Sequence, residues 1–305
     1  MMKKNKVIII AEAGVNHNGK LSLAKKMIDI AVQTKVDYIK FQFFNFKELS
    51  TSWSVSAGYQ LKNTKEKKQQ NLLQKLSLSF EELKILENYA KRKKIKFMLS
   101  IFDFESLKKI KSFKTNYIKI PSGEINNLPF LEKVSKLKKK IILSTGGSSI
   151  KEIQNALKIL KSNKVILLHC VTNYPASPKS VNLNSLKFME KKFKKPIGLS
   201  DHTLGISIPI AATALGAKVI EKHFTLSRKM KGPDHKSSLE PKELKDMVNE
   251  IRKIEVSLGK FNKIIQQEEK KNILLVRKSI VAKKIIIKGE KFTKDNLTVK
   301  RPGTG

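Results

Sequence analysis

Cysteine, acidic residues and long apolar runs are all scarce in this chain of 305 residues. The single cysteine, Cys170, cannot form an intrachain disulfide, so we expect a protein of a reducing compartment. The apolar run Val7–Ile10 is too short for the core of a signal peptide, and no stretch is long enough to span a membrane. We therefore expect a cytoplasmic protein with no membrane partner.

The shortage of negative charge bears on the kind of partner. Lys and Arg number 63 against 26 Asp and Glu, which gives a net charge of +37 and favours anionic partners. Nucleic acid is the first candidate, but the lysines are scattered, and no zinc-knuckle spacing or RNP-like aromatic motif accompanies them. Lys, Asn and Ile are all abundant, as a codon bias toward A and T would produce. We favour this explanation and expect no nucleic-acid partner.

What the chain does contain is a regular alternation of apolar runs and amphipathic segments. Runs rich in Ile and Val are typical of buried parallel strands, and the 40% of hydrophobic residues can fill a full core. Eight runs occur in order: Val7–Ala13, Tyr38–Gln42, Lys96–Phe102, Tyr117–Ser122, Lys140–Thr145, Val165–Cys170, Pro196–Asp201 and Ala217–Phe224. Helix-like patterns lie between them, for example Leu21–Thr34, Phe80–Lys93, Ser148–Leu160 and Ile206–Leu215.

This alternation predicts an α/β fold, a (β/α)8 TIM barrel over residues 1–260. A doubly wound open sheet is the alternative. It would need a phosphate-binding glycine loop after the first strand, and the segment Glu12–Gly19 has only two glycines, at the wrong spacing.

The expected strands end in polar residues, at the edge where barrel active sites lie. Because residues two apart share a face of a strand, Lys40 lies on the same face as Tyr38 and Gln42, opposite Ile39 and Phe41. The apolar face must pack against the surrounding helices, so the other face lies inside the barrel. Lys40, and by the same argument Lys119, therefore point into the barrel. Two buried ammonium groups need anions. A bound ligand is the interpretation that we favour, over local carboxylates such as Glu12, Glu124 or Glu221.

Two histidines end neighbouring expected strands. His202 shares a face with Ser200, and His223 shares a face with Glu221. Strands in a sheet lie about 4.8 Å apart, so the two imidazoles can converge on one ion. We favour a metal site over two histidines that are merely hydrogen-bonded, although the spacing does not name the metal.

Taken together, these motifs resemble the sialic acid synthase family over nearly the whole chain. The segment Ala57–Gln60, followed by Asn63-Thr64, resembles the branch that makes N-acetylneuraminate or diacetyllegionaminate rather than pseudaminate. The matching segments are Ala11–Gly19, Lys40–Gln42, Lys119–Glu124, Leu143–Gly146, His169-Cys170 through Tyr174-Pro175, Gly198–Thr203, Glu221–Thr225 and Gly232–Lys236.

The resemblance implies a TIM barrel with a small C-terminal antifreeze-like (SAF) domain that is swapped across a homodimer. It implies a transferase that condenses phosphoenolpyruvate with an open-chain N-acetylated hexosamine, with Mn²⁺ or Mg²⁺ as cofactor. Metal ligands would be His202 and His223, and Glu12 a catalytic acid or base. Phosphoenolpyruvate would meet Lys40, Lys119 and Ser122. The sugar would meet Gln42, Tyr174, Ser200, Asp234 and Arg301.

The chain departs from the family pattern in places. Leu99-Ser100-Ile101-Phe102 stands where Ser-Thr-Pro-Phe is usual, Phe43 where threonine is usual, and Gly147 where a residue such as Met is common. These changes concern substrate contacts and leave the expected metal and phosphate groups in place. After an expected linker over residues 261–277, residues 278–305 resemble only the opening of the SAF domain.

Two other functions stay open at this point. One is another phosphoenolpyruvate-dependent aldol-type synthase acting on a phosphorylated sugar, which would require a second phosphate site that the sequence does not reveal. The other is a catalytically weakened barrel retained as a basic binding protein.

Overall fold

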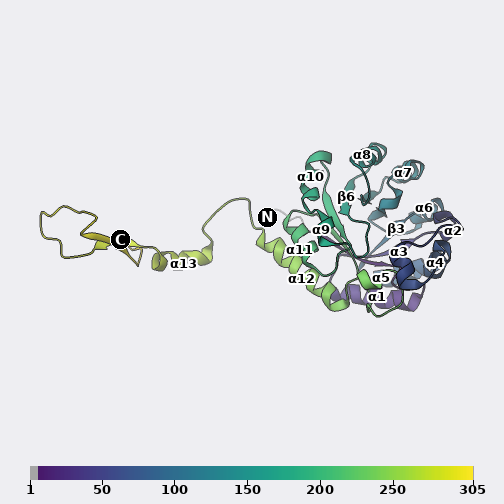
Figure 1. The fold of residues 1–305 in the computed structure, drawn as a ribbon, viewed down its shortest axis with the longest axis horizontal. Helices are drawn as coiled ribbons and strands as arrows, with labels where there is room; N and C mark the ends of the chain where they lie inside the picture. Colours follow the sequence, from purple (N-terminus) through teal and green to yellow (C-terminus); the bar gives the residue numbers. More distant parts are fainter. Residues whose placement is uncertain (1–5, 305) are drawn as a thin grey trace. The chain divides into compact units, whose positions relative to one another are not determined.

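The computed structural model describes residues 6–304, which form two compact units that divide between Leu258 and Gly259. The larger unit contains a closed barrel of eight parallel strands in sequence order, which confirms the predicted (β/α)8 fold (Figure 1). Its strands are β1 Ile8–Gly14, β2 Tyr38–Phe43, β3 Lys96–Ile101, β4 Tyr117–Ile120, β5 Lys140–Ser144, β6 Val165–Cys170, β7 Ile197–Asp201 and β8 Val219–His223.

Each strand overlaps one run expected from the sequence. The bounds differ most at β4 and β8, which are shorter than expected. At β4 the reason is Pro121, which has no N–H to donate to a neighbouring strand, so the strand ends at Ile120. The chain continues directly into a 3₁₀ turn, η2, at Ser122–Glu124. The side chains that follow β4 are thereby placed at the carboxyl end of the barrel.

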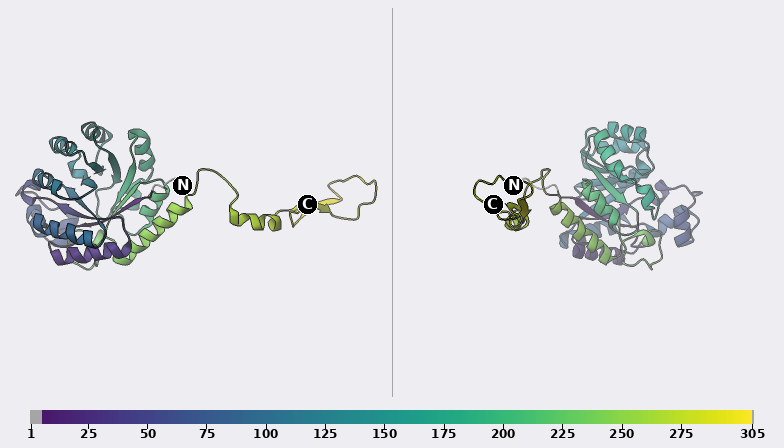
Figure 2. Two further views of the ribbon diagram at one scale, coloured as in Figure 1. Left: turned by 180° about the vertical axis from the view of Figure 1, so that it is seen from behind. Right: turned by 60° about the vertical axis from the view of Figure 1, so that its left-hand side comes forward.

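Helices surround the strands, as Figures 1 and 2 show from three directions. Two of the expected helices begin with a capping box, in which a serine and the glutamate three residues later exchange side-chain to backbone hydrogen bonds. The pairs are Ser79 with Glu82 and Ser149 with Glu152. The principal helices around the strands are α1 Leu21–Thr34, α5 Phe80–Arg92, α6 Phe104–Lys109, α7 Leu128–Ser135, α8 Ile150–Ile159, α10 Asn184–Phe193, α11 Ser207–Ala214 and α12 Pro241–Ser257. Shorter ones are α2 Phe46–Leu49, α3 Gly58–Thr64, α4 Gln69–Leu76 and α9 Pro178–Val181, with 3₁₀ turns η1 Ile110–Ser112 and η3 His235–Ser237.

The core has two parts, and the division follows strand alternation. Outward-facing residues of the strands pack against the helices, as Ile9, Ala11 and Ala13 of β1 do. Inside the barrel, a separate apolar cluster contains Ile10, Tyr38, Met98, Ile142, Leu168 and Val219. Two residues further along β1 and β2, the inward positions are the charged Glu12 and Lys40. The charged layer of the barrel therefore rests on an apolar floor.

The connection between β2 and β3 carries three short helices that the sequence did not predict: α2, α3 and α4. Leu72 and Leu76 of α4 pack with Val15 and Phe44 in a satellite apolar cluster. The loop after β1 approaches α4 closely, since a Cβ on Gly19, whose φ is 68°, would lie 2.3 Å from the Lys75 carbonyl oxygen. This segment thus forms a roof over part of the barrel mouth.

The second unit, from Gly259 onward, has its own small fold. It contains α13 Gln267–Val276 and an antiparallel pair of strands, β9 Ser279–Ala282 and β10 Leu297–Lys300. The Gly303 N–H donates to the Leu274 carbonyl at 2.7 Å, which ties the end of the unit to its helix. The segment 261–277, expected to be a linker, contains α13. No helix among the described residues is long and apolar enough to cross a membrane.

Candidate active site

Four charged side chains form a buried layer inside the barrel. Glu12, Lys40 and Lys119 are each 2% exposed, and Glu221 is 4% exposed. Lys40 Nζ lies 2.9 Å from Glu12 Oε2 and 3.5 Å from Glu221 Oε2, and Lys119 Nζ lies 3.7 Å from Glu221 Oε1. Glu12 and Glu221 are therefore the local carboxylates that hold the two lysines. Glu124, considered from the sequence as a partner, instead accepts from Asn127.

Burial and neighbouring charges separate the pKa values of the two carboxyls. Burial raises the pKa of Glu12, and the nearby Glu221 raises it further, against the opposing effect of Lys40. The Lys119 and Lys40 ammonium groups outweigh burial at Glu221 and lower its pKa to about 2. Such a separation is typical of sites in which one carboxyl exchanges a proton while the other stays ionised. In this pair Glu12 is the carboxyl that takes up a proton first.

His202 and His223 lie side by side at the ends of β7 and β8, with ring centroids 5.6 Å apart. His202 Nδ1 donates to the Val171 carbonyl at 2.6 Å, which leaves its Nε2 lone pair free. His223 Nδ1 is buried and has no hydrogen-bond partner within the described chain. Burial lowers the pKa of both imidazoles, most strongly that of His223, so both are neutral and able to bind a metal.

These two imidazoles fit a divalent cation as a pair of neutral nitrogen ligands. Gly14, with φ of 53°, lies against His223, and a Cβ there would come within 3.1 Å of the imidazole ring. Among residues 6–304, no cluster of three or more His, Cys, Asp or Glu side chains could enclose a metal by itself. The remaining positions around a metal would therefore be left to water or substrate, as in catalytic sites.

Two of the candidate site residues are serines, Ser122 and Ser200. Ser122 Oγ accepts from the Gly146 N–H at 2.9 Å and lies 3.2 Å from Cys170 Sγ. Ser200 Oγ donates to Glu221 Oε1 at 2.9 Å. Ser122 thus stands next to a glycine turn at the end of β5, while Ser200 is engaged with the charged layer.

The remaining sugar-positioning candidates in the barrel unit gather around a cavity of about 270 Å³ at the mouth. Gln42, Tyr174 and Asp234 all line it, together with His223. Tyr174 stacks on Tyr59 with ring centroids 5.0 Å apart and lies 4.0 Å from the His202 ring centroid. Burial, with a smaller contribution from Glu12, raises the pKa of Asp234 to about 7.

Arg301 belongs to the second unit. Its Nε donates to the Val276 carbonyl at 3.0 Å, and its side chain is exposed.

The sequence analysis did not assign three residues to the site: Glu221, Ser100 and Tyr59. Glu221 was noted only as a possible partner, although its place two residues before His223 put it on the same inward face. Ser100 accepts from Lys40 Nζ at 2.6 Å and lies in the strand that departs from the family pattern. Tyr59 stacks over the mouth from α3, and the Ala57–Gln60 motif was the available signal.

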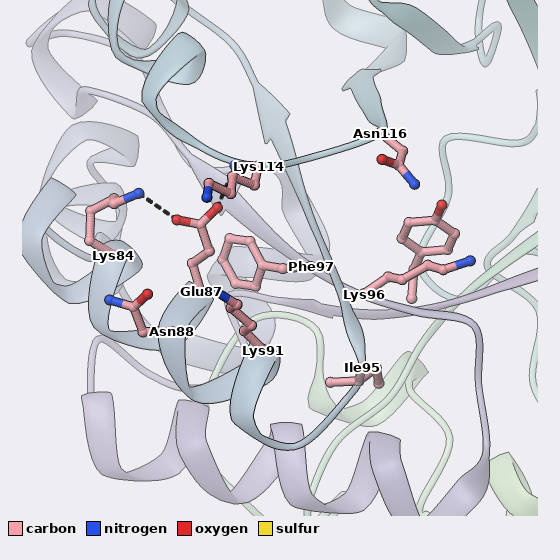
Figure 3. Close-up of a pocket in the computed structure, with 10 residues that line it drawn as sticks. Lys84, Glu87, Asn88, Lys91, Ile95, Lys96, Phe97, Lys114 and Asn116 are labelled. Carbon is pink, nitrogen blue, oxygen red and sulfur yellow. Dashed lines mark hydrogen bonds and ion pairs between the residues drawn. The ribbon is translucent and has the colours of Figure 1, made fainter.

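A second hollow, of about 280 Å³, lies at the opposite end of the strands (Figure 3). Lysines surround it, but its carboxylate, Glu87, is already engaged by the Lys84 ammonium and the Lys114 N–H. Tyr38 and Lys96 place it at the amino ends of β2 and β3. Barrel active sites are built at the carboxyl ends, so the cavity above Glu12 and His223 is the candidate site.

The chain is similar to known proteins over nearly its full length. The model of the NeuB family matches residues 27–263. The N,N'-diacetyllegionaminic acid synthase of Campylobacter jejuni is 50% identical over 306 residues, covering 98% of this chain and 92% of that protein. The enzyme of the same name from Legionella pneumophila is 41% identical, and the match covers 97% of this chain and 86% of that protein.

A solved structure shows the same relationship in three dimensions. The N-acetylneuraminic acid (sialic acid) synthetase of Leptospira borgpetersenii superposes with a TM-score of 0.80 at 38% identity, covering 88% of this chain and 91% of that one. Legionaminic and sialic acid synthases condense phosphoenolpyruvate with acetylated hexosamines. The chain is thus an enzyme that belongs to the NeuB family of synthases.

Proposed function

We propose that this enzyme condenses phosphoenolpyruvate with an open-chain, diacetylated 6-deoxy hexosamine and water to give a legionaminic-type nonulosonic acid and phosphate. The observation that carries the proposal is the buried layer of two lysines and two carboxylates beneath paired neutral histidines at the barrel mouth. The 50% identity to a N,N'-diacetyllegionaminic acid synthase supports the choice of sugar. N-acetylmannosamine is the alternative sugar.

The charged layer is suited to phosphoenolpyruvate. Lys40, Lys119 and Ser122 would hold its carboxylate and phosphate, with the Gly146 N–H next to Ser122. Two buried ammonium groups whose charges are balanced by carboxylates can accept an anion if one carboxyl takes up a proton. Glu12, whose pKa is raised by burial, is the group for this.

Glu12 then acts as the acid or base of the condensation. The third carbon of phosphoenolpyruvate forms a bond to the sugar aldehyde carbon, positive charge develops at the second carbon, and water adds there as phosphate leaves. The protonated Glu12 gives its proton to the aldehyde oxygen as the carbon–carbon bond forms. The carboxylate that results stabilises the charge at the second carbon and then takes up a proton from the attacking water. Glu221, held ionised by both lysines, keeps the layer charged throughout.

Synthases of the NeuB family are in general metal-dependent, and His202 and His223 would hold the ion here, as Mn²⁺ or Mg²⁺. Such an ion supplies a Lewis acid for the aldehyde oxygen. The chain's own contribution is to keep both imidazoles neutral by burial and to orient His202 through the Val171 carbonyl.

We further propose a homodimer in which Arg301 reaches the sugar in the partner's barrel. The second unit leaves many large apolar side chains uncovered: Ile280 and Ile287 are each 71% exposed and Phe292 is 74% exposed. An apolar surface of this kind on a small unit is typical of a segment that packs against another chain. The planar guanidinium of Arg301 suits recognition of an N-acetyl oxygen.

The test is phosphate release from phosphoenolpyruvate with a panel of N-acetylated sugars, with and without Mn²⁺. A His202→Ala/His223→Ala double variant should lose metal-stimulated turnover and keep its far-UV circular dichroism. His169→Gln is the matched control. His169 lies on β6, and its Nε2 donates a hydrogen bond to the Val181 carbonyl, so it is a histidine outside the proposed metal site. Full Mn²⁺-stimulated turnover in the double variant would refute the metal assignment. Failure of every sugar would favour the weakened barrel with a binding role.

A further inference from the structure

The cavity at the barrel mouth has two chemically different sides. On one side lie the polar groups already described: Gln42, Tyr174, His223 and Asp234. The apolar part of the lining belongs to one packed cluster and comes from the loop after β1, from α2 and α4, and from the residue that follows β3. This apolar wall consists of Val15, Leu49, Leu72, Leu73, Leu76 and Phe102.

The apolar wall is a packed and anchored structure. Val15, Leu72 and Leu76 are buried in the satellite cluster, whereas Leu49, Leu73 and Phe102 are only half-buried and leave surface toward the cavity. Two hydrogen bonds fasten α4 to the end of α2: Gln70 Nε2 donates to the Ser50 carbonyl at 2.7 Å, and Ser50 Oγ donates to Gln69 at 3.0 Å. The wall therefore has a fixed position relative to the barrel mouth.

The wall itself offers no hydrogen-bonding side chain. Three polar side chains at its border have an oxygen that already accepts a hydrogen bond: Gln60 from the Ala57 N–H, Gln69 from the Ser50 hydroxyl and Glu124 from Asn127. A hydroxyl pressed against Leu49, Leu73 and Phe102 would lose water without gaining a partner, which is unfavourable. A methyl group in the same place would be favourably removed from water.

The position of the reaction decides which end of the sugar meets this wall. The aldehyde carbon must lie at the polar side, near Glu12 and His223, where the new bond forms. An open-chain hexose is elongated, so its fifth and sixth carbons extend away from that point, across the cavity.

We propose that the apolar wall is the subsite for the end of the sugar remote from the aldehyde, and that it selects a 6-deoxy sugar over one with a 6-hydroxyl group. This proposal rests on the proposed function and assigns specificity mainly to residues of the β2–β3 connection, outside the barrel strands. Apolar pockets discriminate against one added hydroxyl by about 10- to 100-fold in kcat/KM.

The sharpest test uses two sugars that differ in one oxygen atom: N-acetylmannosamine and its 6-deoxy analogue. The full-length enzyme with Mn²⁺ should prefer the 6-deoxy sugar by at least about tenfold in kcat/KM. Leu73→Gln on α4 and Leu49→Gln on α2 should each bring this ratio toward one, mainly through the KM of the 6-deoxy sugar. Leu73→Met, which keeps the wall apolar, is the matched control and should retain the preference.

The outcomes separate this proposal from the proposed function. A wild-type ratio near one, or an unchanged ratio in both glutamine variants, overturns the specificity subsite while the condensation itself stands. Loss of turnover with both sugars in both glutamine variants, with Leu73→Met still active, also overturns it, because a selectivity subsite leaves the hydroxylated sugar a substrate. If no sugar, including a diacetylated one, releases phosphate with the wild type, the proposed function fails and this inference fails with it.

Discussion

Lys222 carries a prediction that depends on one buried ion pair. Its side chain is fully buried on the outward face of β8, and its ammonium group donates to Asp201 Oδ2 and to the Thr203 carbonyl. Asp201, 2% exposed, also accepts from the Thr203 N–H at 3.1 Å and from its hydroxyl at 2.9 Å. These contacts hold both residues that flank His202 in the chain.

The substitution Lys222→Met keeps most of the side-chain volume and removes the charge. Asp201 is then left as a buried carboxylate without a cation, an arrangement that costs about 3–5 kcal/mol. For a unit of this size, 1 kcal/mol corresponds to roughly 2–4 °C in Tm, so we expect a loss of about 6–20 °C. Adding Asp201→Asn removes the unpaired charge and should restore at least about 2 kcal/mol.

The assay is urea unfolding followed by far-UV circular dichroism, because the single tryptophan, Trp53, is 80% exposed and reports poorly on burial. Lys253→Met is the matched control: its ion pair with Glu250 is on the surface, and its loss should change the free energy of unfolding by less than about 1 kcal/mol. The reasoning is refuted if Lys222→Met costs no more than this control, or if the double variant is no more stable than Lys222→Met alone.

Three other predictions follow from the site. Asp234→Asn should be more stable than the wild type at pH 8, by up to about 4 kcal/mol, because a carboxyl whose pKa is raised from 3.8 to about 7 destabilises the fold as pH rises through that range. The gain should vanish near pH 4 in urea unfolding, and a constant gain would contradict this. With bridging-¹⁸O phosphoenolpyruvate, mass spectrometry should find the label in phosphate, because water adds at the second carbon; label retained in the sugar acid would exclude this step. Mixed Arg301→Ala and His202→Ala homodimers should recover activity toward about a quarter of the wild type after subunit exchange, since about half of the dimers then hold one intact site. Exchange without recovery would show that Arg301 does not serve the partner's barrel.

The strands and the polar layer could be predicted from the sequence, because both depend on local pattern. Runs of Ile and Val bounded by turn residues indicate buried strands wherever they occur. A period of two then assigns Lys40 and Glu221 to the inside of the barrel without knowledge of the neighbouring strands. The same reasoning placed His202 and His223 at adjacent strand ends, where the structure has them.

Contacts between distant parts of the chain were decided by the tertiary structure alone. Lys40 could have paired with any carboxylate at the mouth, and the stagger of the closed barrel brings it to Glu12 and Glu221, with Ser100 as a third partner. The roof of α2 to α4 consists of short helices and is held by packing against Val15 and Phe44. Which side chains face the sugar therefore depends on how the β2–β3 connection folds back over the barrel, and that is determined by packing between segments rather than by the pattern within any one of them.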